Sequence, residues 1–144
     1  MRFLLLTAVL LATACRRAPA PGAAIEYRAP DGSFTAKLPS NWKADEAPGE
    51  TRKAAFFGPP DGAEPYSQMM GVYFHAAAKP EGPLDSTAET VQPNPHGGSE
   101  TVITRTVAVP AAGGYFTLVQ MYPAGSEPSA SFAELVSTFK PAKP

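Results

Sequence analysis

The sequence offers few side chains that could do chemistry. It contains one cysteine, Cys15, and two histidines, His75 and His96. An enzyme would need a nucleophile beside a base, paired carboxylates in a pocket, or three to four metal ligands. The sequence has no Gly-x-Ser-x-Gly motif, no phosphate-binding loop and no Gly-x-Gly-x-x-Gly motif. We therefore expect a non-enzymatic protein with no catalytic residue and no cofactor, and an enzyme is only a distant alternative.

A metal site is the first alternative to examine. Met69, Met70 and His75, with Met121 further along, carry the thioether and imidazole groups that bind soft Cu(I). Methionine beside aromatic residues more commonly fills a hydrophobic core. His75 ends an apolar segment, which favours a packed role, and His96 lies in a Gly- and Pro-rich loop, which favours a solvated one. We expect no metal site, and small-ligand or metal binding remains the alternative function.

The N-terminus has the organisation of a secretory signal. Met1 and Arg2 supply a positive start, residues 3–11 an apolar segment, and residues 12–14 the small residues of a cleavage site. Cys15 follows directly. Because it is the only cysteine, the exported domain can form no internal disulfide, and a free thiol would be reactive in an oxidising compartment.

This leader resembles the bacterial lipoprotein signal. The resemblance implies that residues 1–14 are removed, that Cys15 becomes the first residue, and that the modification attaches three acyl chains to it, with lipid joined to the sulfur as a thioether. Two or more chains hold a protein firmly to a membrane. Residues 15–23, rich in Pro and Ala, then form a flexible tether. Arg16 stands where aspartate would favour the inner membrane, so we expect the periplasmic side of the outer membrane. An ordinary signal peptide with a nearby cysteine is the alternative.

Composition indicates one folded domain, over residues 24–141. The chain has 144 residues, of which 44% are hydrophobic, and its 17 prolines and 12 glycines are spread along it. Cleavage of the leader leaves 11 basic and 13 acidic residues, a net charge of −2. With so small a charge, we expect no nucleic acid partner.

Proline is excluded from helix interiors and central strands, so the prolines divide the domain into elements. Alternating apolar residues predict a hairpin of residues 25–27 and 34–38, then strands at 51–58 and 67–78. Both faces of 67–78 are largely apolar, which is typical of a sheet covered on both sides. The strongest strand pair is 101–110 with 113–123.

Two helices are expected. Residues 84–92 could form a short middle helix, with Asp85 or Ser86 as its N-cap and Glu89 completing a capping box from Ser86. Residues 129–140 have the apolar spacing of an amphipathic helix, and Ser131 with Glu134 suggests its capping box.

The order of these elements resembles the PsbP-like superfamily, which includes extrinsic photosystem II proteins and DcrB-type envelope lipoproteins. The matching pieces are the strand that runs into Pro39–Trp42 and the segment Phe132–Phe139. The resemblance implies an α+β fold, with an antiparallel sheet of about six strands between helices (an α/β/α sandwich). It places Trp42 in the core or at its rim, in preference to ligand stacking.

Members of that superfamily act mainly as assembly, stabilising or accessory factors and share no catalytic mechanism. We therefore expect a lipid-anchored periplasmic domain that binds a protein of an envelope complex. The membrane, through the lipid on Cys15, is its other expected partner.

Overall fold

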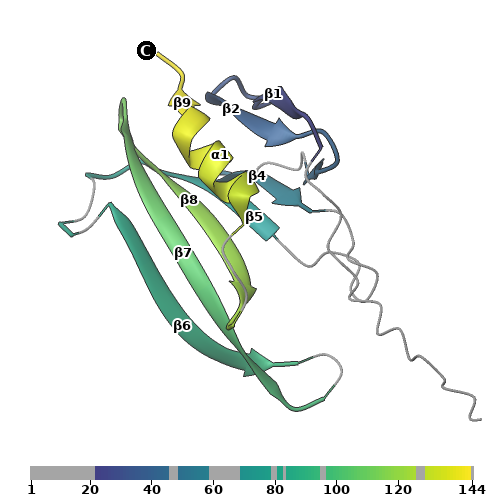
Figure 1. The fold of residues 1–144 in the computed structure, drawn as a ribbon. Coiled ribbons are helices and arrows are strands. Elements are labelled where there is room, and N and C mark those ends of the chain that lie inside the picture. The colour runs from purple at the N-terminus through teal and green to yellow at the C-terminus, as the bar shows by residue number, and fades with distance from the viewer. Residues whose placement is uncertain are drawn as a thin grey trace, which may run out of the picture.

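A computed structural model describes residues 22–45, 49–58, 69–78, 81–82, 84–94, 97–125 and 129–143. They form two antiparallel sheets and one helix, so the α+β expectation is confirmed (Figure 1). The signal, Cys15 and nearly all of the tether lie outside the described residues. The elements are β1 (Ala24–Arg28), β2 (Phe34–Pro39), β3 (Lys43–Asp45), β4 (Arg52–Phe57), β5 (Met69–His75), β6 (Asp85–Pro93), β7 (Ser99–Ala111), β8 (Gly114–Pro123), α1 (Ala130–Thr138) and β9 (Lys140–Pro141).

The predicted N-terminal hairpin is confirmed. β1 pairs with β2 in a register that places Ile25 opposite Leu38 and Tyr27 opposite Ala36. The turn between them closes through a hydrogen bond of 2.8 Å from the Gly32 N–H to the Ala29 carbonyl. Gly32 has a φ of 70°, a conformation that glycine adopts without steric cost.

This hairpin does not join the main sheet, contrary to the expectation of one sheet. It pairs with β9, which follows the helix, to make a separate sheet in the order β1-β2-β9. The main sheet still has six strands, in the order β3-β4-β5-β8-β7-β6. The pairing of Phe34 with Pro141 joins residues far apart in the sequence, so no local pattern indicates it.

The middle helix is a wrong prediction, because residues 85–93 form strand β6. All nine residues pair with β7, from Asp85 opposite Val107 to Pro93 opposite Ser99. Asp, Ser, Thr and Val are weak helix formers, and Thr and Val favour strands. A long neighbouring strand therefore outweighs the local capping pattern.

The C-terminal helix is confirmed, but its cap is not the predicted one. Ser129 is the N-cap, and its Oγ accepts a hydrogen bond of 3.1 Å from the Ser131 N–H. Ser131 itself lies buried in the first turn, so it forms no capping box with Glu134. At the other end, Thr138 Oγ1 accepts a hydrogen bond of 2.9 Å from the Lys37 N–H of β2.

The core lies between the main sheet on one side and α1 with the small sheet on the other. Phe34, Phe116 and Phe139 meet there, with ring centroids 4.9 to 6.0 Å apart. Phe132 and Leu135 of α1 are fully buried against the same cluster. Helix and small sheet thus cover the same face of the main sheet, and the expected α/β/α sandwich with a helix on each face is not what the described residues form. No helix among the described residues is long and apolar enough to cross a membrane.

Candidate functional site

His75 is a packed residue, as the sequence predicted. Its ring stacks on Tyr115 with centroids 4.7 Å apart, and its Nε2 lies 3.0 Å from Thr117 Oγ1, a hydrogen bond. Both partners belong to β8, the neighbouring strand. His75 therefore contributes to the cohesion of two central strands. His96 lies outside the described residues.

The methionines and the histidine considered as copper ligands do not come together in one place. Met69 and Met121 lie directly opposite each other on β5 and β8, but Met70 points to the other face and is fully buried in the core. His75 lies six residues along β5 from Met69, a distance of about 20 Å. Among the described residues no group of three or more His, Cys, Asp or Glu side chains could hold a metal ion.

Trp42 packs against the core, as expected from its place in the sequence. Its backbone N–H donates a hydrogen bond of 3.0 Å to the Pro39 carbonyl, which closes the turn after β2. A Cβ built on Gly58 would lie 3.2 Å from the indole. Glycine at that position therefore leaves room for the Trp42 ring beside the main sheet.

The face of the main sheet that points away from α1, here called the outer face, carries large side chains. On β5 and β8 these alternate with the core residues, and they are half-buried. The Tyr73 ring lies over Gly71, where an added Cβ would come within 2.7 Å of it. No helix among the described residues lies on this face. Its members on the two central strands are Met69, Tyr73, His75, Tyr115, Thr117, Val119 and Met121.

Gln120 is a polar side chain that the sequence analysis did not single out. It is fully buried on the core face of β8, between Leu118 and Tyr122 in the alternating pattern. Neither its Nε2 nor its Oε1 has a hydrogen-bond partner among the described residues. Gln120 could have been noticed in the sequence, because it stands at a position of the strand where the alternating pattern places apolar residues. Burying an amide without partners reduces the stability of the fold.

Ion pairs connect several of the described elements, and one of them joins Arg52 of β4 to Asp45 of β3 at 3.1 Å. Arg105 on β7 makes a two-pronged contact with Asp85 on β6, with Nη2 to Oδ2 at 2.6 Å and Nε to Oδ1 at 3.0 Å. The hydrogen bonds from Arg105 lower the pKa of Asp85, and the same contact raises the pKa of Arg105. Lys53 Nζ lies 3.2 Å from Asp31 Oδ2. Burial raises the pKa of Asp31, but hydrogen bonds from Ser33 and Lys53 outweigh it and the net pKa is lowered.

A cavity of about 350 Å³ opens at the end of the sheet where the β7–β8 turn approaches the C-terminal segment. Phe74, Phe116 and Ala111 form its apolar wall, and Lys143 lies at its rim. The sequence did not indicate it, because its walls come from four separate segments. This volume lies at the lower end of the range of small-molecule pockets.

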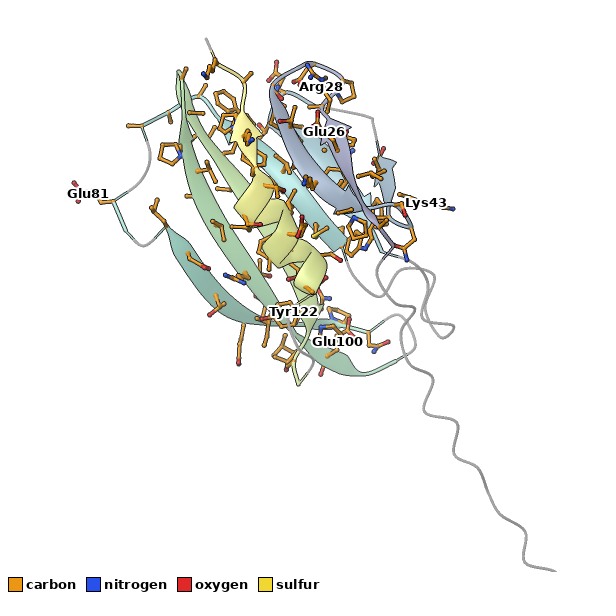
Figure 2. The ribbon with its side chains drawn as sticks, turned by 45° about the horizontal axis from the view of Figure 1, so that its top comes forward. Glu26, Arg28, Lys43, Glu81, Glu100 and Tyr122 are labelled. Carbon is orange, nitrogen blue, oxygen red and sulfur yellow. The ribbon has the colours of Figure 1, made fainter. Side chains whose placement is uncertain are left out.

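Acidic side chains mark the two ends of β6. Figure 2 shows Glu81, on the connection that leads into β6, pointing away from the sheets, and Glu100 at the opposite end of the strand. Glu100 accepts hydrogen bonds from Gln92 at 3.2 Å and from Asn94 at 3.3 Å. The sequence analysis missed this surface because it assigned residues 84–92 to a helix.

Comparison with known proteins shows a shared fold. No family model matches the sequence, and no curated protein matches it. A crystal structure at 1.50 Å resolution of a protein from Bacteroides thetaiotaomicron VPI-5482 is similar, with a TM-score of 0.58 and 13% sequence identity. The alignment covers 82% of this chain and 48% of that one, so this chain spans about half the length of its neighbour. At that identity the likeness concerns the fold alone.

Proposed function

We propose that this protein is a lipid-anchored, non-enzymatic domain of the bacterial envelope that binds a partner protein in the periplasm. The outer face is the observation that carries the proposal. Its aromatic and methionine side chains lie on the two central strands, and no described helix covers them. Tyrosine, other aromatics and methionine are enriched at the centres of protein interfaces.

The partner's contact would cover the middle of this face. Tyr115 and His75 already stack on each other, so binding there would order few additional side chains. Tyr73, packed over Gly71, is held in a similar way. A preorganised aromatic surface of this kind favours a specific protein contact.

The finer family assignment, a PsbP-like domain, belongs to the same proposal. The turn at Pro39–Trp42 and the buried positions of Phe132, Leu135 and Phe139 support it. The departure is β6, a strand where the family resemblance implied a helix. Accessory and assembly roles in an envelope complex fit a domain that presents binding surfaces in place of a catalytic centre.

Site-specific photocrosslinking in cells tests the partner. A benzophenone side chain replaces Val119, on the outer face, and as a matched control replaces Glu26, which is exposed on β1. We expect a discrete crosslinked protein from position 119 and none from position 26. The same products from both positions, or none from position 119, would show that the outer face binds no partner.

The anchor is tested separately with Cys15→Ser. Removing the sulfur should abolish labelling by a palmitate analogue and release the protein from the membrane fraction. Normal processing with continued membrane fractionation would contradict lipidation. Arg16→Asp is the companion variant, and it should move the protein from the outer to the inner membrane fraction.

The cavity at the β7–β8 turn favours a second candidate function, binding of a small apolar ligand. A compound that fills it would contact Phe74 and Phe116. A ligand at a hundredfold its dissociation constant stabilises a protein by about 2.7 kcal/mol. A panel of short fatty acids and aromatic metabolites should therefore include one that raises the melting temperature, and Ala111→Trp should remove that shift.

A further inference from the structure

The edge of the main sheet formed by β6 has no described strand beyond it. Such an edge carries backbone N–H and C=O groups that are free to pair with another strand. We propose that the β6 edge binds an extended, lysine- or arginine-bearing segment of the partner protein by adding it as a further strand. This inference rests on the proposed function and names a second contact with the same partner.

The other sheet edges have features that block strand addition. β3 has three residues and begins at Lys43, and β9 has only two. β1 has five residues and ends at Arg28, and Pro30 stands two positions beyond it. Short length, cationic side chains and proline all discourage pairing at an edge. β6 has nine residues, no lysine or arginine, and its only proline is the last residue.

β6 is also regular along its whole length. Its nine pairs with β7 run in one unbroken register, whereas the β4–β5 ladder shifts between Arg52 and Ala54. A bulge would twist the edge and interrupt pairing. Without one, alternate residues of β6 direct their backbone groups outward along the whole edge. Figure 1 shows this edge on the side of the main sheet away from the three-stranded sheet.

The acidic side chains along the β6 edge favour a basic segment as its binding partner. β6 carries Asp85 and Glu89, and Glu81 and Glu100 lie near its ends. Arg105 neutralises Asp85, but none of the ion pairs between described residues includes Glu89. A second copy paired about the middle of β6 would place Glu89 opposite itself, and like charges in that position destabilise the pair. A lysine or arginine opposite Glu89 would instead be favourable.

Apolar contacts would add to the backbone pairing. Leu84 and Val91 are two of the three large exposed hydrophobic residues of the described chain, and they stand at the two ends of this edge. Val91 is 68% exposed. An added strand would bring aliphatic side chains beside them and remove both from water.

A peptide of nine residues that alternates valine and lysine is the probe, and the lipidated full-length protein in lipid nanodiscs is the target. Fluorescence anisotropy measures binding of three versions: the parent, one N-methylated at alternate residues, and one with glutamate in place of lysine. We expect the parent to bind and both altered peptides to bind at least about tenfold more weakly, since one loses backbone donors and the other meets like charge.

Matched protein variants locate the site. Glu89→Lys should weaken binding of the parent peptide about tenfold, since it replaces an attractive charge with a repulsive one. Glu26→Lys, the same charge change at an exposed position on β1, should not. Equal binding of the N-methylated peptide would overturn strand addition. So would equal loss in both variants, which would indicate attraction by net charge alone.

Sedimentation of the lipid-free Cys15→Ser protein distinguishes a second copy from a partner. We expect a monomer, and a dimer that dissociates when Thr87 is replaced by proline would overturn the proposal in favour of self-pairing. The photocrosslink at position 119 tests the outer face independently. If that crosslink persists and no peptide binds, the edge assignment is wrong and the proposed function stands.

Discussion

The two ends of the main sheet differ in how their strands are covered. At one end, β4, β5 and β8 lie under α1 and the small sheet, where Phe56, Met70 and Leu118 are fully buried. At the other end β6 and the part of β7 that pairs with it, Ser99–Val107, form what we call the β6–β7 arm. Every β6 side chain except Gln92 is exposed. The first end supplies most of the core, to which the arm adds Val107, and β6 contributes surface.

This difference should appear most strongly in truncations to alanine. Phe132 is fully buried at the covered end. Phe132→Ala should lower the free energy of unfolding by about 3–5 kcal/mol, because the change leaves a cavity. Val91→Ala on the arm should change it by no more than about 0.5 kcal/mol. Urea unfolding followed by tryptophan fluorescence measures both. Similar losses in the two variants would show that β6 shares in the core.

The sequence predicted the covered end and β7 better than β6. Strands β2, β5, β7 and β8 follow from their alternating apolar residues, and α1 follows from the spacing of Phe132, Leu135 and Phe139. In these elements one face is buried, so apolar residues recur with the period of the strand or helix and can be recognised in the sequence. The structure also confirmed the prediction that His75 is a packed residue.

β6 was predicted wrongly because its residues bury almost nothing, whereas the strand period of β7 was recognised. Without a buried face, the segment 84–92 shows no strand period, and Ser86 with Glu89 suggests a helix start. Only the ladder with β7 determines its structure, and a partner strand is invisible to a local pattern. The β6 edge therefore could not be predicted either. Membership of the hairpin in a separate sheet was missed for the same reason, since β9 pairs with it from the far end of the chain.

Two glutamines extend the comparison at a smaller scale. Gln120, at the covered end, is fully buried with both amide atoms unpartnered among the described residues, whereas Gln92 on the arm donates to Glu100. Gln120→Leu should raise the unfolding free energy by about 1–2 kcal/mol, because it removes the cost of burying the amide. Gln92→Leu should leave it unchanged or slightly lower. Thermal unfolding compares the two, and a loss of stability in Gln120→Leu would reveal polar partners for the amide.

The smallest expected effect concerns the ion pair that ties β6 to β7. Asp85 and Arg105 are both partly exposed, so solvent screens their contact and Asp85→Asn should cost only about 0.5 kcal/mol. Because the folded state lowers the pKa of Asp85, the pair contributes its full stability above the ordinary carboxyl pKa and loses it as the pH falls through the lowered value. The difference in unfolding free energy between wild type and Asp85→Asn should therefore be present at pH 7 and shrink below about pH 4. Asp45→Asn, which removes the contact with Arg52 on β4, is the matched control outside the arm.

Hydrogen exchange separates local from global effects of the same variant. Asp85→Asn should speed exchange in β6 and leave the amides of β5 and β8 protected, because the arm can open without unfolding the covered end. Equal acceleration in all three strands would mean that the arm and the covered end unfold as one unit.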